Sequence, residues 1–96
     1  MADPLNTTAN ITNVSSKVLL GNSARTMVTF VNSGLNNIYI SKGIDAVSGS
    51  GILLQPGGAH TMYATGDKAQ VGIFRGDIYA CTDISTSQLS ICEEYS

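Results

Sequence analysis

Two cysteines are the residues of this chain whose type and spacing most directly suggest chemistry. Cys81 and Cys92 are its only cysteines. If the C-terminal part forms a hairpin that turns about the Thr86–Ser87 bond, the two residues face each other across neighbouring strands. That register makes a cross-strand disulfide geometrically possible. A reducing cytoplasm would keep both as thiols, so the bond would form after release into an oxidising medium.

The remaining reactive side chains do not form a recognisable catalytic or metal-binding pattern. His60 is the only histidine, and no nucleophile motif such as Gly-x-Ser-x-Gly accompanies it. Asp45, Asp67, Asp77 and Asp83 lie in or beside turns, where aspartate commonly bonds backbone N–H groups. Their spacing is not that of a calcium loop, and two cysteines without a histidine partner do not make a zinc site. We therefore expect no enzyme, no catalytic residue, no metal and no cofactor.

The composition predicts one small domain with an unusually uncharged surface. The chain has 96 residues, of which 43% are hydrophobic and only 12% are charged, whereas soluble domains average about 25% charged residues. Ser, Thr, Asn, Gln and Gly must therefore supply most of the surface. Such a surface suits either a secreted type of protein or one that packs closely against neighbouring proteins.

Charge and hydropathy exclude two classes of partner. The net charge is −2 and the five basic residues are scattered singly, which argues against nucleic-acid binding. No run approaches the roughly 20 apolar residues of a membrane span. The N-terminus also lacks the charged and apolar regions of a signal peptide. With Met1 as the natural start, we expect synthesis and retention in a cytoplasm.

Short apolar and β-branched runs, separated by Gly, Pro and Asn turns, predict an all-β fold. About eight short strands with turn signals every 8–12 residues are typical of a small antiparallel β-sandwich, of jelly-roll or Greek-key type. The expected strands are Lys17–Leu20, Thr26–Val31, Ile38–Ser41, Ile52–Leu54, Ala59–Tyr63, Ala69–Phe74, Ile78–Thr82 and Gln88–Glu94.

The strands of the segment Arg25–Gly43 should form a hairpin at the centre of the sandwich. Its two alternating runs are separated by the turn-forming residues 32–37. We expect one face of this hairpin to be buried and the other half-exposed. The predicted core comprises Val28, Phe30, Ile38, Ile40, Leu54, Val71, Ile73, Ile78 and Ile91.

Residues 1–16 differ from the rest of the chain and predict an extended polar arm. This stretch is rich in Asn, Thr and Ser and has few large apolar side chains. Ile11 and Val14 are too few to build a core, so we expect a partner to order the arm through contacts with Leu5, Ile11 and Val14. The predicted organisation is an arm at 1–16 followed by a β-sandwich domain at 17–96.

Several short patterns in order give the chain a wider resemblance. They are Arg25-Thr26-Met27-Val28-Thr29-Phe30-Val31-Asn32, Ile38-Tyr39-Ile40-Ser41-Lys42-Gly43, Ile52-Leu53-Leu54-Gln55-Pro56-Gly57-Gly58, Phe74-Arg75-Gly76-Asp77-Ile78-Tyr79-Ala80 and Leu89-Ser90-Ile91-Cys92-Glu93-Glu94. This sequence resembles the small β-sandwich virion proteins of tailed bacteriophages, which include capsid decoration (cement) proteins. The resemblance covers residues 17–94, and the cysteine pair is not part of it.

The resemblance implies a virion component on the outer capsid surface, synthesised in the host cytoplasm. Its partners would be the major capsid protein and further copies of itself, as a homotrimer at three-fold sites that stabilises the shell. The alternative is a carbohydrate- or host-surface-binding module of a fibre or tail. In that case Tyr39 and Tyr63 would contact the ligand, because tyrosine suits surfaces that are part apolar and part wet.

Overall fold

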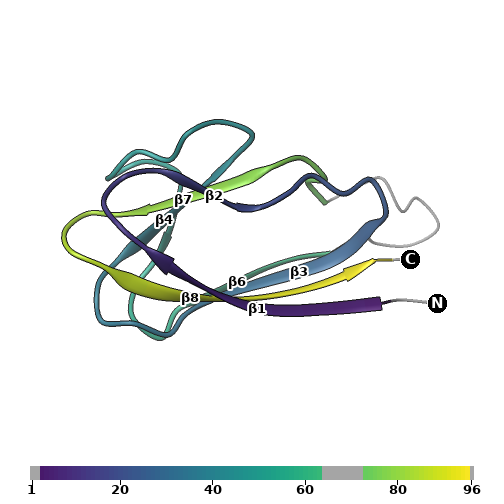
Figure 1. Ribbon diagram of the computed structural model, residues 1–96, viewed down its shortest axis with the longest axis horizontal. Coiled ribbons are helices and arrows are strands. Elements are labelled where there is room, and N and C mark those ends of the chain that lie inside the picture. The colour runs from purple at the N-terminus through teal and green to yellow at the C-terminus, as the bar shows by residue number, and fades with distance from the viewer. Residues whose placement is uncertain (1–2, 64–72, 96) are drawn as a thin grey trace.

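The protein is a sandwich of two four-stranded antiparallel β-sheets (Figure 1). The computed structural model describes residues 3–63 and 73–95. Four strands make the first sheet, in the order β1 (Asp3–Ile11), β8 (Ser87–Tyr95), β3 (Arg25–Asn32) and β6 (Ala59–Tyr63). The second sheet has the order β2 (Ser16–Leu19), β7 (Ile78–Thr82), β4 (Ile38–Lys42) and β5 (Ile52–Leu54).

The strand pairing is that of a jelly roll. The first strand pairs with the last, β1 with β8, and the pairs β2–β7, β3–β6 and β4–β5 follow inward along the chain. Such a nested pairing arises when one long hairpin is folded over into two sheets, which is the architecture of jelly rolls. The all-β sandwich expected from the sequence is therefore confirmed, and the pairing decides between its two expected topologies.

The expected central hairpin is wrong. β3 and β4 begin and end almost where the sequence predicts, but β3 belongs to the first sheet and β4 to the second. The connection at 33–37 thus crosses from one sheet to the other. An alternating pattern shows which face of a strand is buried. It does not show whether two such faces lie side by side in one sheet or opposite each other across the core.

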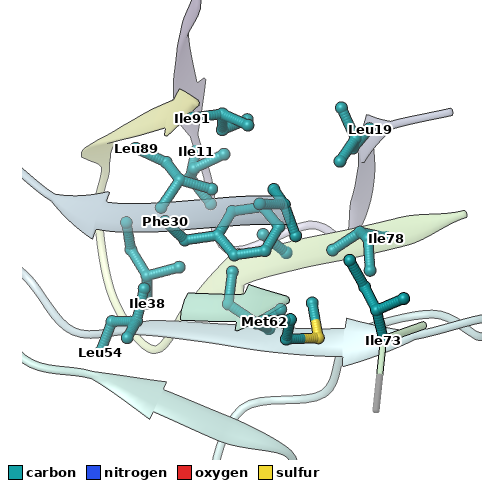
Figure 2. Packing of buried hydrophobic residues seen from close by; sticks show 13 residues of the cluster. Ile11, Leu19, Phe30, Ile38, Leu54, Met62, Ile73, Ile78, Leu89 and Ile91 are labelled. Atoms are coloured by element: carbon teal, nitrogen blue, oxygen red, sulfur yellow. The ribbon is translucent and has the colours of Figure 1, made fainter. Parts of the chain in front are cut away.

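The expected burial of the two faces is nevertheless correct. Val28, Phe30, Ile38 and Ile40 are fully buried, while the alternate residues of β3 and β4 are partly exposed. In Figure 2 the Phe30 ring lies among residues from both sheets. All the expected core residues that the structure describes are buried, and the remaining one, Val71, lies outside the described residues. The core also contains Ile11, Leu19, Met62, Ala80 and Leu89, which were not expected there.

The other strand predictions agree with the structure to within one residue, except for the expected strand Ala69–Phe74. β5, β6 and β7 have the predicted bounds, β2 is displaced by one residue toward the N-terminus, and β8 is one residue longer than predicted at each end. For the expected strand Ala69–Phe74, residues 69–72 lie outside the described part, and Ile73 and Phe74 are not in a strand.

Part of the expected N-terminal arm belongs to a sheet. Residues 3–11 are extended, as predicted, but they form β1 along the whole length of β8. Ile11 is fully buried in the core. This strand therefore contributes to the sandwich itself.

The two ends of the sandwich differ in what they carry. Both chain termini lie at one end, which we call the terminal end (Figure 1). The β3–β4, β5–β6 and β7–β8 connections lie together at the other end, the loop end. There the backbone N–H of Gly57 donates to the carbonyl of Asn32, and that of Ser33 to Gln88. The β1–β2 connection joins this end through the N–H of Thr82, which donates to the carbonyl of Thr12.

Candidate interaction surface

β1 forms a long sheet edge. It pairs with β8 through an unbroken register from Asp3↔Tyr95 to Ile11↔Ser87, and among the described residues it pairs with no other strand. Along its free side, the backbone therefore has N–H and C=O groups with no strand partner. Leu5, Thr7, Ala9 and Ile11 lie on the same face of the strand, and their burial increases toward Ile11.

This edge lacks most of the features that normally prevent strands from adding to one another. Native edges are commonly protected by lysine, by proline, by bulges or by shortness. No charged side chain occurs from Pro4 to Ser16, the β1–β8 register contains no bulge, and Pro4 is only the second residue of the strand. Of the other edges described, β6 has five residues, β2 four and β5 three, against nine in β1.

The outer face of the first sheet beside this edge is covered by short, mostly uncharged side chains. A shallow groove of about 300 Å³ crosses β1, β8 and β3, and its lining is Asn6, Thr7, Thr8, Thr29, Val31, Ser90, Ile91 and Cys92. The hydroxyls of Thr29 and Thr61 are 3.0 Å apart and continue this row onto β6. Because no charged residue lines the groove, another protein can cover it without desolvating a charge there.

The structure separates the five side chains expected to contact partners. Leu5 is 39% exposed on β1, Val14 is 69% exposed in the β1–β2 connection, and Tyr63 is 57% exposed on β6. Tyr39 is half-buried on β4 in the second sheet. The expectation for Ile11 is wrong, because this side chain is fully enclosed by the core and cannot reach a partner.

The cysteines are also separated, because the expected C-terminal hairpin does not form. β7 and β8 lie in different sheets, and the connection between them crosses the sandwich. Cys81 is opposite Tyr39, whereas Cys92 is opposite Asn6 on one side and Thr29 on the other. Both are free thiols.

The two thiols have different surroundings. Cys81 is buried. Burial is the main cause of its raised pKa, and the nearby Asp83 carboxylate raises the pKa further. A raised pKa reduces the thiolate fraction and hence the reactivity. Cys92 is partly exposed and lines the groove on the outer face.

A buried ion pair joins the sheet to the connections at the terminal end. The Arg25 Nε donates to Glu93 Oε2 at 2.5 Å, and both side chains are almost completely buried. The guanidinium also donates to the carbonyls of Leu20 at 2.8 Å and Phe74 at 2.7 Å. These contacts fix β3, β8 and two connections relative to one another, so we assign Arg25 and Glu93 a structural role.

A second, exposed ion pair lies at the same end. Asp77 accepts from the Gly21 N–H at 2.6 Å and lies 3.2 Å from the Lys17 Nζ. The Gly21 N–H, and next the Lys17 ammonium, hold the pKa of Asp77 below its ordinary value. The same pairing raises the pKa of Lys17. This turn aspartate therefore bonds backbone as the sequence predicts, and it fastens the β2–β3 connection.

At the loop end, the side chain of Asn32 holds neighbouring connections together through hydrogen bonds. Its amide nitrogen donates to the carbonyls of Asn36 at 2.7 Å and Leu54 at 2.8 Å. Its amide oxygen accepts from the Gly34 N–H at 3.0 Å and the Ser87 hydroxyl at 2.8 Å. All hydrogen-bonding positions of this fully buried amide are thus used to hold the crossing from β3 to β4.

Among the residues that the structure describes, the other polar side chains do not gather into a cluster that could hold a metal ion, since no three His, Cys, Asp or Glu side chains lie together in that way. His60 is half-buried on β6, opposite Phe30 in the register. The part of the chain that the structure describes also has no helix long and apolar enough to span a membrane.

Comparison with known proteins yields similarity of fold only. No protein-family model matches the chain, and no curated protein matches it. A solved structure from work titled "Bacillus endospore appendages form a novel family of disulfide-linked pili" is similar over 100% of this chain and 87% of its own, with a TM-score of 0.50. The sequence identity is 11%, so the likeness concerns the arrangement of strands.

The features that form this surface were only partly predictable. Contacts from residues 1–16 were expected from the sequence, but the strand β1 was not. The signal was present in the alternation of Leu5, Thr7, Ala9 and Ile11 with Asn6, Thr8 and Asn10, which has the period of a half-buried strand.

Proposed function

We propose that this protein is a structural subunit that joins other protein subunits by adding a strand at the β1 edge. The observation that supports this most directly is the nine-residue edge without a charged side chain from Pro4 to Ser16. Strand addition satisfies the free backbone groups of such an edge and is a recurring mode of protein recognition. The uncharged groove face beside the edge allows the partner to pack closely.

Two kinds of assembly fit this proposal. In the first, copies of the chain add to one another and form a fibre. The likeness in fold to an endospore appendage subunit supports this form. The pili built from that protein are described as disulfide-linked. In this chain an intermolecular disulfide would use Cys92, because Cys81 is buried.

In the second form, the chain decorates a phage capsid as a trimer bound to the major capsid protein. The sequence resemblance to capsid decoration proteins supports this form. A fibre subunit forms large assemblies from the purified protein alone. A decoration protein remains a monomer or small oligomer until capsid shells are added. Cosedimentation with shells that lack decoration would then saturate at one defined stoichiometry, and absence of binding would refute this form.

The carbohydrate-binding alternative has less support. Tyr39 and Tyr63 lie on different sheets, so they do not form one stacking platform. A glycan array would test it directly, since retention that is lost in Tyr63→Ala without loss of folding would favour this alternative.

The edge itself is tested by placing lysines on it. We expect the Asn6→Lys/Thr8→Lys variant to fold but to lose self-association or shell binding, because lysine on an edge strand opposes strand addition. A matched control is Ser48→Lys/Ser50→Lys, which adds the same charge in the exposed β4–β5 connection. Sedimentation velocity and electron microscopy of wild type and both variants, with and without shells, measure the outcome. Undiminished assembly of the edge variant would contradict the proposal.

A further inference from the structure

A hollow of about 390 Å³ opens between two free strand edges. β1 ends the first sheet and β2 ends the second, and the hollow lies in the gap between them. Leu5 and Thr7 of β1 line one side, and Val18 of β2 and Leu20, the residue after β2, line the other. Because Thr7 is at the middle of β1, the hollow runs along this strand and is not confined to one end of the sandwich. We call it the edge hollow.

The apolar side chains around the edge hollow are left partly uncovered. Leu5 lies on the same face of β1 as the core residue Ile11, yet it is 39% exposed. Leu20, on the other side of the hollow, is 70% exposed. The two sheets therefore do not close over these side chains. Apolar surface that is left open in this way gains free energy when a partner covers it.

The charged side chains near the edge hollow already have partners. Among the described residues that line it, only Glu93 is charged, and its carboxylate is paired with the buried Arg25. Lys17, the one charged residue of β2, is paired with Asp77. An apolar side chain of a partner can therefore enter the hollow without desolvating a free charge, whereas a charged side chain would find no unpaired counterion there.

The geometry of a sheet places alternate side chains of an added strand over this hollow. Side chains that are neighbours across a ladder point to the same face of the sheet. In a strand added at the free side of β1, the residues beside Leu5 and Thr7 would therefore point toward the second sheet and into the edge hollow. Successive residues of a strand alternate between the two faces. Every second side chain of the partner would thus face the hollow, and the others would lie beside Asn6 and Thr8 on the outer face.

We propose that the edge hollow is the side-chain pocket of strand addition, and that the partner supplies an extended segment with a large apolar side chain at every second position. The backbone of this segment pairs with β1, and its apolar side chains fill the space between β1 and β2. This inference rests on the proposed function and adds the chemistry of the partner. In strand addition the backbone hydrogen bonds give affinity, and pockets for alternate side chains give specificity. A volume of about 390 Å³ is near the lower end of the roughly 300–1,000 Å³ of ligand pockets, so it suits side chains and not a folded domain.

Synthetic peptides with an alternating pattern test this inference. One set carries Val, Leu or Phe at every second position with Thr between them, and a matched set carries Ser in place of the apolar residue. The hollow variant of the protein is Leu20→Asp. Its control is Ile44→Asp, which adds the same charge in the β4–β5 connection at an aliphatic residue that is 72% exposed, against 70% for Leu20. Neither variant changes β1. Fluorescence anisotropy of labelled peptides measures the dissociation constants, and amide exchange of Leu5–Asn10 measures pairing with β1.

We expect the best apolar peptide to bind the wild type at least about tenfold more tightly than its serine counterpart, because it buries apolar side chains in the hollow. It should also slow amide exchange along β1. Leu20→Asp should remove the preference for the apolar peptide, because it places an unpaired charge at the hollow. Ile44→Asp should retain the preference.

The outcomes distinguish the pocket from the edge. If both sets of peptides slow exchange along β1 and bind equally well, strand addition is supported and the inference is overturned. If an apolar peptide binds through Leu20 but leaves exchange along β1 unchanged, the hollow takes another kind of apolar ligand, and the inference is again overturned. If no peptide slows exchange along β1, strand addition at this edge fails and the inference fails with it.

Discussion

Arg25 and Asn32 occupy the two ends of β3 and hold the two ends of the sandwich. They are the first and last residues of the pattern Arg-x-x-Val-x-Phe-x-Asn, and both are fully buried. From the sequence, Asn32 was expected in a turn and neither residue was expected in the core, because strand patterns assign charged and amide residues to the surface. Their burial depends on partners from distant segments, such as Glu93 and Leu54, which one sequence does not reveal.

Removal of one member of the buried ion pair should strongly destabilise the fold. We expect Arg25→Met to lower the free energy of unfolding by about 3–5 kcal/mol, because it leaves the Glu93 carboxylate buried without a partner. Lys42→Met, at an exposed strand end, is the control and should change little. Urea unfolding measures both. If Arg25→Met matched the control, the pair would not anchor the terminal end.

The Asp77 carboxylate should make stability depend on pH in acid. Its pKa is lowered in the folded protein from the ordinary 3.8 by the Gly21 N–H and by Lys17. Its contribution to stability is therefore present above the ordinary pKa and is lost as pH falls through the lowered folded value. We expect the unfolding free energy of Asp77→Asn to vary less with pH below about pH 4 than that of wild type. Equal slopes for the two proteins, measured by denaturant titration, would contradict this.

At the scale of the element, the hydrophobic period and the composition predicted where the strands lie, but not which strands pair with each other. β5, β6 and β7 have the predicted bounds, and the buried faces of β3 and β4 are correct. Both predicted hairpins fail for one reason: the connections at 33–37 and 83–86 cross between sheets. Short turn-rich connections join strands within a sheet or across a sandwich, and local sequence does not distinguish the two.

The role of β1 in the fold can be separated from its role as an edge. We expect Ile11→Ala to lower the free energy of unfolding by about 2–5 kcal/mol, because it leaves a cavity in the core. Val14→Ala removes a side chain that is 69% exposed and should have little effect. Thermal or urea unfolding of the two variants compares them. Similar, small effects would mean that residues 1–16 are an arm outside the fold.

At the scale of the whole molecule, the nesting of strands in a jelly roll fixes which edges remain. Because β1 pairs with β8 and β3 with β6, the first sheet ends in β1 on one side and β6 on the other. The sequence predicted the sandwich but not this order, since the order depends on pairings between residues as distant as Asp3 and Tyr95. The free β1 edge and the groove across β1, β8 and β3 both follow from this topology.

Amide hydrogen exchange along β1 tests the proposed strand addition most directly. It would be measured residue by residue for Leu5–Asn10 in dilute protein and in the assembled state, formed either by the chain alone or on shells. We predict that outward-facing amides of β1 exchange at least about tenfold more slowly after assembly, because a partner strand then accepts their hydrogen bonds. Unchanged exchange along β1 in a sample shown to be assembled would contradict strand addition at this edge.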